Sequence, residues 1–248
     1  MKKINLLLLL AFCLPIIMNA QWNSRTKVKG NGNMITKNIS TTNYDQIAVS
    51  GFFEVELVSG EEGKITLQAE ENLVEYIIIK VENNTLKMSI ENEVWLNPSR
   101  GHKVLITVPF ESLTAVSLSG SGDIRSKNKI KAAEFKSTLS GSGDIHLDID
   151  AKEVTGEVTG SGDMVLKGKS EEFKCTVTGS GDLNATGLES AIVSAKVTGS
   201  GDCSVYCSES LEARVTGSGD ISYYGDPKKK IRKSLVRATF RKDKIIII

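Results

Sequence analysis

The sequence predicts an all-β fold, a right-handed parallel β-helix (β-solenoid) with about 20 residues per rung. The tetrapeptide Gly-Ser-Gly-Asp, here called the corner, occurs six times, and successive copies are 21, 19, 19, 20 and 18 residues apart. Apolar residues alternate with polar ones on both sides of each corner, which is typical of β-strands with one buried face. A single rung cannot bury that face alone, so the rungs must stack. The strict hexapeptide period of left-handed β-helices is absent, which favours a right-handed coil.

Apolar residues keep fixed positions relative to the corner. Two residues before its first glycine stand Leu118, Leu139, Val158, Val177, Val197 and Val215. Four residues after that glycine stand Ile124, Ile145, Met164, Leu183, Cys203 and Ile221. Because side chains alternate along a strand, both columns are predicted to face the core. The residue before each corner is then predicted to face outward as a column of hydroxyls: Ser119, Ser140, Thr159, Thr178, Thr198 and Thr216.

The region before the first corner repeats less regularly. Residues 49–55 (VSGFFEV) can be laid over residues 118–124 (LSGSGDI), which places Glu54 at the position of Asp123. We therefore predict one β-solenoid domain over residues 21–248. It comprises irregular N-terminal rungs (21–110), regular Gly-Ser-Gly-Asp rungs (111–227) and a basic C-terminal cap (228–248).

The first 20 residues are predicted to be a secretory signal peptide. Lys2 and Lys3 precede an apolar stretch that is too short to span a bilayer stably, and Asn19-Ala20 gives a small-residue exit. Lipoprotein processing at Cys13 is disfavoured because the bulky Phe12 precedes it. No later stretch is long enough for a transmembrane helix. The protein is expected to be exported to the periplasm, the outer-membrane surface or the extracellular space.

Charge is distributed unevenly along the chain. Without Lys2 and Lys3 the formal charge falls from +1 to −1, and residues 228–248 hold nine Lys or Arg and one Asp, or +8. The formal charge of residues 21–227 is therefore −9, because residues 21–248 carry −1 in total and residues 228–248 carry +8 of it. A basic run of this kind is usually a solvated face, and no nucleic-acid partner is predicted.

Three cysteines follow the predicted signal peptide: Cys175, Cys203 and Cys207. Their odd number and their spacing do not indicate a disulfide framework or a metal site. Cys175 and Cys203 fall in inward columns, where a free thiol packs as a small hydrophobe. We predict that the cysteines are buried.

The aspartates of the six corners form the principal candidate site: Asp123, Asp144, Asp163, Asp182, Asp202 and Asp220. Carboxylates one rung apart repel by about 1 to 4 kcal/mol, depending on the effective dielectric. They must therefore splay into water, accept hydrogen bonds from turn N–H groups, or share cations. The favoured interpretation is a turn in which two glycines permit positive φ and Ser and Asp bond nearby N–H groups. A Ca²⁺ ladder is the alternative, because calcium-binding β-rolls also combine glycine turns with aspartate oxygens. No other cofactor is expected.

Catalytic motifs are sparse. Residues 162–170 (GDMVLKGKS) miss the spacing of a phosphate-binding loop, and no helix pattern follows them. The two histidines, His102 and His146, give little material for a triad or a zinc site. A polysaccharide lyase would combine Ca²⁺-bound aspartates with a basic side chain, and Arg125 and Lys167 are the candidates for that role. A repeated corner preserves symmetry, whereas a catalytic site breaks it, so no enzyme is predicted.

A signal peptide, the segment VSGFFEVELVSG, the SGSGDI and TGSGD corners and the final ISYYGDP resemble the bacterial head GIN domain family of auto-transporter adhesins. The resemblance covers roughly residues 35–240. It implies a right-handed β-helix similar to pectin lyase-like folds, export to the envelope and a role in adhesion. It carries over no catalytic residue.

The predicted function is that of an exported, non-enzymatic β-solenoid that acts as an adhesin or surface-binding protein of the envelope. Its expected partner is a surface glycan or an envelope protein. Two alternatives stay open: a calcium-dependent polysaccharide-binding or lyase-like protein, and a purely structural envelope component. Aromatic residues near the late corners are few, namely Tyr206, Tyr223 and Tyr224, with Trp22 and Trp95 elsewhere. The pattern leaves the oligomeric state open.

Overall fold

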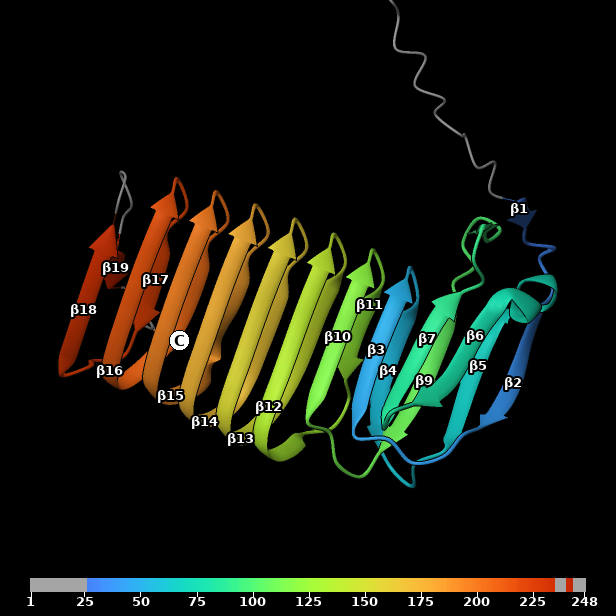
Figure 1. Ribbon diagram of the computed structural model, residues 1–248, viewed down its shortest axis with the longest axis horizontal. Helices are drawn as coiled ribbons and strands as arrows, with labels where there is room; N and C mark the ends of the chain where they lie inside the picture. The colour runs from blue at the N-terminus through green and yellow to red at the C-terminus, as the bar shows by residue number, and fades with distance from the viewer. Residues whose placement is uncertain (1–25, 235–239, 243–248) are drawn as a thin grey trace, which may run out of the picture.

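The computed structural model describes residues 26–234 and 240–242. This part of the chain is the predicted all-β solenoid with about 20 residues per rung. The coil is right-handed: in Figure 1 the strands that lead into the corners rise on the near side, and the chain descends behind them while it advances toward the C-terminal end. The predicted signal peptide, residues 1–20, lies outside the described residues. Within the described ranges, no helix has the length and hydrophobicity needed to cross a membrane.

The regular rungs consist of strands that pair in parallel with the corresponding strands of the next rung. Corners align with corners: Gly120 pairs with Gly141, and the column continues through Gly160, Gly179, Gly199 and Gly217. The strands are β10 (Ala115–Gly120), β11 (Asp123–Ser126), β12 (Ile130–Gly141), β13 (Asp144–Gly160), β14 (Met164–Gly179), β15 (Leu183–Gly199), β16 (Cys203–Gly217) and β17 (Ile221–Tyr224).

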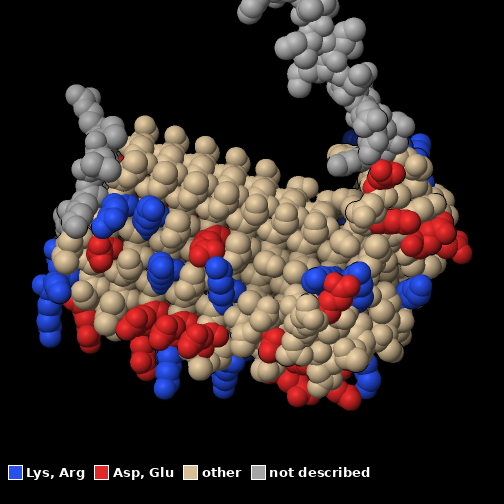
Figure 2. Space-filling model, in the orientation of Figure 1, with Lys and Arg blue, Asp and Glu red and all other residues tan. Residues whose placement is uncertain are grey.

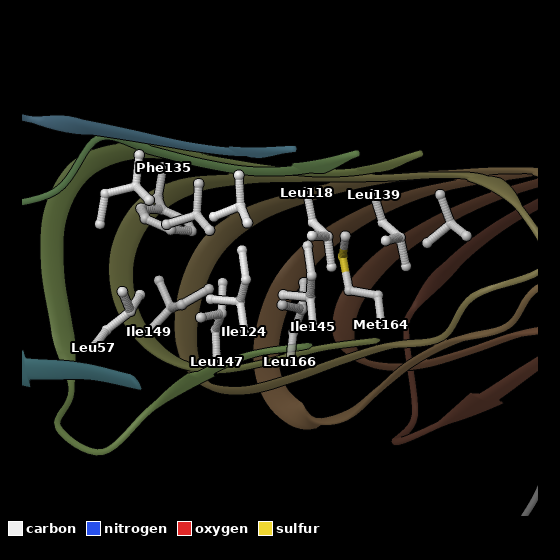
Figure 3. Packing of buried hydrophobic residues seen from close by; sticks show 14 of the residues in the cluster. Leu57, Leu118, Ile124, Phe135, Leu139, Ile145, Leu147, Ile149, Met164 and Leu166 are labelled. Carbon is white, nitrogen blue, oxygen red and sulfur yellow. The ribbon is translucent and has the colours of Figure 1, made fainter. Parts of the chain in front are cut away.

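Two layers of strand face each other across one continuous apolar core (Figure 3). Leu118 and Leu139 enter this core from the layer before the corner, and Ile124, Ile145 and Met164 enter from the layer after it. All twelve members of the two predicted apolar columns are buried, which confirms the predicted parity. Along β13 the inward alternation breaks at residues 150–153, where the chain bends from one layer to the other.

The cysteines contribute to this core. Cys175, Cys203 and Cys207 are buried free thiols, which confirms the prediction that they are buried. The sulfur atoms of Cys175 and Cys203 lie 3.3 Å apart. The hydrogen bond with Cys203 and burial both raise the pKa of the Cys175 thiol. Cys175 therefore packs as a protonated thiol in the core and is not a reactive thiolate.

The N-terminal rungs do not stack in chain order. β3 (Gln46–Gly51) and β4 (Glu54–Ser59) pair with β10 and β11, so that Gly51 lies opposite Gly120 and Glu54 opposite Asp123. This register confirms the predicted alignment of residues 49–55. On the other side of the same rung lie β7 (Thr85–Ile90) and β9 (Leu105–Phe110). The chain thus runs outward after β4 and returns past its own first rung, which the repeat pattern did not predict.

Antiparallel strands close the N-terminal end. β2 (Met34–Ser40) pairs with β5 (Lys64–Glu70), β5 pairs with β9, and β6 (Ile77–Glu82) pairs with β7. A 3-10 helix, η1 (Glu71–Tyr76), connects β5 to β6. A short parallel pair, β1 (Thr26–Lys29) with β8 (Val94–Asn97), forms a separate two-stranded sheet beside this end.

One buried carboxylate ties the loops of this end together. Glu70 is 1% exposed and accepts hydrogen bonds from the backbone N–H groups of Gly32 and, at 2.8 Å, Ser99. The Nδ1 atom of His102 lies 3.5 Å from Glu70 Oε1. A Cβ atom on Gly30 would meet the same carboxylate at 2.0 Å, so a larger residue there would displace the Glu70 side chain from its hydrogen bonds. Glu70 therefore holds the loops that follow β1 and β8.

At the other end, β18 (Lys229–Ser234) and β19 (Phe240–Lys242) pair in parallel with β16 and β17. Of the predicted basic cap, residues 228–234 and 240–242 are described. Lys229 and Lys230 are exposed on β18, the strand at this edge of the sheet. Lysine on an edge strand disfavours edge-to-edge pairing with another chain.

Candidate functional site

The corners form a continuous row along one edge of the solenoid, held by backbone hydrogen bonds between rungs. From Gly120 to Gly199, the carbonyl of the first glycine of each corner accepts two N–H groups from the corner of the next rung. For example, Ser180 and Gly181 both donate to the Gly160 carbonyl, at 2.8 and 3.0 Å. Gly51 begins the series by accepting from Ser121 and Gly122. The same turn thus occurs seven times, and each copy contacts the equivalent turn of the neighbouring rung.

The two glycines of a corner are required for different reasons. The first glycine has a positive φ, for example 118° at Gly179, as predicted. The second has no positive φ, so that prediction is wrong for the second position. Instead, a Cβ atom on Gly181 would lie 2.1 Å from the carbonyl oxygen of Gly162 one rung away. Close stacking of backbones, rather than turn conformation, excludes a side chain there.

The aspartates lie in one column, and their carboxylates bond across rungs. The Oδ1 atom of Asp144 accepts the N–H of Asp163 at 3.2 Å, and Asp163 accepts that of Asp182 at 3.0 Å. Asp182 and Asp202 bond the N–H groups of Asp202 and Asp220 in the same way, both at 2.8 Å. The expected bond to turn N–H groups is present, but it joins successive rungs instead of closing each turn locally.

The first two corners differ from the others. There the N–H groups of Asp123 and Asp144 donate to the carbonyls of Phe53 and Gly122. From Asp163 onward the side chain of the preceding aspartate replaces that carbonyl as the acceptor. Asp163, Asp182 and Asp202 are exposed, whereas Asp123, Asp144 and Asp220 are half-buried. The carboxylates are therefore components of the turn and still reach solvent.

The geometry of the aspartate row does not supply a complete set of oxygen ligands for Ca²⁺. In the part of the chain that the structure describes, no three His, Cys, Asp or Glu side chains are grouped to hold a metal ion. Ca²⁺ takes six to eight oxygen ligands, and one oxygen of Asp144, Asp163, Asp182 and Asp202 already accepts an N–H group. The Ca²⁺ ladder stays a prediction, with Asp163, Asp182 and Asp202 as its most accessible members.

Replacing these three exposed aspartates separates the structural role from the metal role. The triple variant Asp163→Ala, Asp182→Ala, Asp202→Ala is expected to lower the free energy of unfolding by about 2 to 4 kcal/mol, because each substitution removes an acceptor. The matched triple Asn variant keeps a carbonyl oxygen and relieves repulsion, so it should stay within about 1 kcal/mol of the parent. Urea unfolding of residues 21–248 measures both.

The same proteins test the ladder when Tm is followed during a Ca²⁺ titration with Mg²⁺ as the control. A saturable rise with Ca²⁺ that the triple Asn variant lacks would establish a cation ladder. A flat response would leave the row as turn architecture alone. An Asn variant as unstable as the Ala variant would contradict the acceptor role.

A column of hydroxyls runs beside the corners on the outer surface of the layer that leads into them. Its members are paired in register from rung to rung: Ser50, Ser119, Ser140, Thr159, Thr178, Thr198 and Thr216. All are exposed or half-exposed, which confirms the predicted outward parity. In Figure 2 the upper margin of the visible face, where the corners lie, consists of uncharged side chains, and charged ones gather lower down.

At its N-terminal end this column enters a cleft of about 500 Å³. Ser50 and Ser119 line one side of the cleft, and Trp95 and Glu91, from the segment that leads into and forms β8, line the other. Trp95 is 54% exposed, whereas most large apolar side chains of the described residues are buried. Trp95 could not be connected with the corners from the sequence, because nothing in the repeat predicts that β8 lies beside the first rungs.

The candidates for a lyase do not form a catalytic group. Arg125 lies on β11, and its partners in the strand register are Glu56 on one side and His146 on the other. Glu56 itself forms an ion pair with Lys127, at 2.8 Å. Lys167 lies two rungs further along and is paired with Asp148 at 3.6 Å. Cross-rung ion pairs of this kind balance charge on the outer surface.

Residues 162–170, the sequence that approaches a phosphate loop, run from a corner into the extended strand β14. His102 contacts Glu70 at the N-terminal end, and His146 lies on the outer side of β13, far along the chain from it. The structure therefore places the two histidines in separate surroundings.

Comparison with known proteins agrees with this architecture. A family model described as "Putative auto-transporter adhesin, head GIN domain" matches residues 43–227. No curated protein matches the sequence.

Several solved structures share the fold. A "putative adhesin" from Bacteroides fragilis NCTC 9343 superposes with a TM-score of 0.78 at 22% identity, over 88% of this chain and 100% of that one. A "putative lipid binding protein" from Parabacteroides distasonis ATCC 8503 gives 0.73 at 22% identity, over the same shares of the two chains. A "putative adhesin" from Parabacteroides merdae ATCC 43184 gives 0.69 at 21% identity, over 88% of this chain and 99% of that one.

Proposed function

The chain belongs to the family described as "Putative auto-transporter adhesin, head GIN domain", and we propose that it is an exported, non-enzymatic adhesin of the bacterial envelope. Its solenoid presents one repeated polar face to a surface glycan or an envelope protein. Two of the solved structures that share its fold, each described as a "putative adhesin", are consistent with this role. The calcium-dependent and purely structural alternatives are separated from it by the experiments below and by the Ca²⁺ titration.

The hydroxyl column is the observation that carries the proposal. Seven hydroxyls from seven rungs stand in register on the outer surface, about 4.8 Å apart. Each can donate and accept a hydrogen bond. Stacked backbone at the corners holds them at fixed spacing, so little conformational entropy is lost when a ligand binds along the row. A repeated partner, such as a polysaccharide, matches a repeated surface.

Binding to cells tests the proposal. Fluorescently labelled protein, residues 21–248, is expected to bind intact bacterial cells or extracted envelope polysaccharide saturably. Three stacked substitutions, Thr159→Lys, Thr178→Lys and Thr198→Lys, should weaken that binding at least tenfold, because they replace hydroxyls by bulky charges in the middle of the column. Flow cytometry and a pull-down of the polysaccharide fraction measure the loss.

The chain offers a matched control on the opposite layer. Asn184, Ser204 and Ser222 also stand in register on three neighbouring rungs. Their replacement by lysine adds the same charge and leaves the hydroxyl column intact, so binding should be retained. Asn184→Lys also removes the acceptor of the Thr186 N–H and hydroxyl groups, so circular dichroism confirms that the control is folded. Equal losses in the two sets, or no saturable binding by the parent protein, would contradict an adhesive role for this face.

A further inference from the structure

The layer of strands that leads into the corners carries a basic face at its C-terminal end. We define this face by four residues on neighbouring strands, Lys174 of β14, Lys196 of β15, Arg214 of β16 and Lys229 of β18. All four are exposed. In Figure 2 basic side chains gather near the C-terminal end of the visible surface, below the uncharged margin. Each of four neighbouring strands thus contributes one cation to this end of the solenoid.

The strand register brings these cations close to one another. Lys196 pairs with Arg214, and Lys174 pairs with Ser194, two residues before Lys196. Paired residues of neighbouring strands are about 4.8 Å apart. A depression of about 150 Å³ lies between the side chains and is lined by Lys174, Lys196, Arg214 and Glu212, among others. Like charges opposite each other destabilise a sheet, so the arrangement favours an anion at this position.

Carboxylates compensate the charge of the basic face only in part. The Nη2 atom of Arg214 lies 3.4 Å from Glu212 Oε1. Among the residues that the structure describes, the three lysines of the face form no ion pair. On a rung nearer the N-terminus, by contrast, Lys136 of the same layer pairs with Glu157 at 2.9 Å. The lysines at the C-terminal end therefore offer positive charge to a partner.

Exposed aliphatic side chains lie within the same face. Ile192 and Ile231 are 43% and 40% exposed, and they are two of the four most exposed large apolar residues in the described part of the chain. Ile231 pairs with Glu212, and Ile192 pairs with Ser210, which in turn pairs with Lys229. The two isoleucines are two strands and two residues apart, or about 12 Å. Single exposed aliphatic residues are common, but two of them among uncompensated cations indicate an interaction surface.

The mixture of cations and aliphatic side chains favours a membrane over a soluble anion as the partner. A soluble polyanion would neutralise the lysines but would leave both isoleucines in water. An anionic bilayer offers phosphate groups to the cations and apolar acyl chains to the isoleucines, which is the combination that interfacial segments use. Glu172, which pairs with Ile192, limits the face on its N-terminal side.

We propose that the basic face docks the protein on the surface of a membrane that contains anionic lipids. Its cations contact lipid phosphate groups, and Ile192 and Ile231 enter the boundary between the headgroups and the acyl chains. The proposal goes beyond the adhesin function, because it concerns how the protein itself is held at the envelope. It does not depend on the ligand of the hydroxyl column.

Sedimentation with lipid vesicles tests the proposal. Residues 21–248 are expected to bind vesicles of phosphatidylglycerol and phosphatidylcholine but not vesicles of phosphatidylcholine alone. Binding should be lost at about 1 M salt, where the Debye length falls to about 3 Å. Each basic side chain near an anionic membrane favours binding about fivefold, so the variant Lys174→Gln, Lys196→Gln should bind about 25-fold more weakly. Neither lysine forms an ion pair, so the variant should remain as stable as the parent protein.

The chain offers a matched pair of lysines outside the basic face. Lys131 and Lys152 are exposed on β12 and β13, and the variant Lys131→Gln, Lys152→Gln removes the same net charge but should retain vesicle binding. The variant Ile192→Ser, Ile231→Ser keeps every cation and should weaken vesicle binding by about tenfold or more, because two apolar side chains are lost from the interface. Circular dichroism confirms that each variant is folded.

No binding to the anionic vesicles by the parent protein, equal losses in the two lysine pairs, or full binding by the isoleucine variant would overturn the proposal. Binding of dextran sulfate in place of vesicles would also overturn it, since the partner would then be a soluble polyanion.

The two lysines of the test variant lie outside the hydroxyl column, which separates this proposal from the adhesin function. Cell or polysaccharide binding that persists in Lys174→Gln, Lys196→Gln while vesicle binding is lost would support a membrane face distinct from the adhesive one. Vesicle binding by a parent protein that adheres to no cells would contradict the adhesin function and still support the membrane face.

Discussion

Replacing Gly181 by alanine is expected to cost the protein about 4 kcal/mol or more in the free energy of unfolding, a loss at the extreme of point substitutions. The added Cβ would lie 2.1 Å from the Gly162 carbonyl oxygen, and the opposing group is backbone that cannot rotate away. The rungs must separate, which weakens the bonds that the Ser180 and Gly181 N–H groups make to Gly160. Chemical unfolding followed by far-UV circular dichroism measures the loss.

Gly60→Ala is the matched control for this substitution. Gly60 has no positive φ, and the nearest atom to an added Cβ there is a side-chain carbon of Pro109 at 3.5 Å, an ordinary contact. Its replacement should change the free energy of unfolding by no more than about 0.5 kcal/mol. If Gly181→Ala behaved like Gly60→Ala, the close stacking of corners would not be a determinant of the fold.

Replacing Glu70 by glutamine is expected to cost about 3 kcal/mol at pH 7, the cost of breaking a buried, hydrogen-bonded charge. The N–H groups of Gly32 and Ser99 donate to different oxygens of Glu70, Oε1 and Oε2, so the amide NH₂ of glutamine would face one of these donors and leave it without an acceptor. The loops that follow β1 and β8 would loosen. Urea unfolding measures the loss of stability.

The same carboxylate predicts an acid dependence of stability. Burial alone would raise the pKa of Glu70, but the hydrogen bonds from Ser99, Gly32 and His102 outweigh it and lower the pKa to about 2 from 4.5. A group whose pKa falls on folding stabilises the native state above its unfolded pKa. About 3 kcal/mol is therefore lost as the pH falls from about 5 toward 2.

Unfolding at pH 7, 5, 4 and 3 measures that loss, which the variant Glu70→Gln should lack. Glu153→Gln is the control, because Glu153 is exposed on β13, and its acid dependence should match the parent protein. An unchanged acid dependence in Glu70→Gln would assign the acid sensitivity to other carboxylates.

The repeat made the regular rungs predictable from the sequence. Each rung repeats the same parity around the corner, so that Leu118 and Ile124 are buried and Ser119 is exposed for the same local reasons as their counterparts. Even the irregular residues 49–55 could be aligned, because Gly51 keeps the corner glycine and Glu54 keeps its acid. Period-2 alternation is a local property, and local patterns determine side-chain direction.

The parts that were missed depend on long-range contacts. The repeat does not show that β7 and β9 lie on the outer side of the β3–β4 rung, because the order of stacking is not a local property. For the same reason Trp95 was not associated with Ser50 and Ser119, although these residues line one cleft. The acceptors of the aspartate N–H groups were also unpredictable, since a carboxylate can bond within its own turn or across rungs with similar geometry.

The excursion from β4 to β9 has a consequence for assembly of the chain. The first rung, β3–β4, is covered on one side by strands that follow it and on the other by β10 and β11, which follow later still. A chain that emerges from a membrane with its N-terminus first therefore exposes this rung until about residue 126 has appeared. The regular rungs then add one after another, each completed as soon as its own residues are available. Their number sets the length of the solenoid in steps of about 4.8 Å, so a whole rung could be gained or lost while the cleft at the N-terminal end stays unchanged.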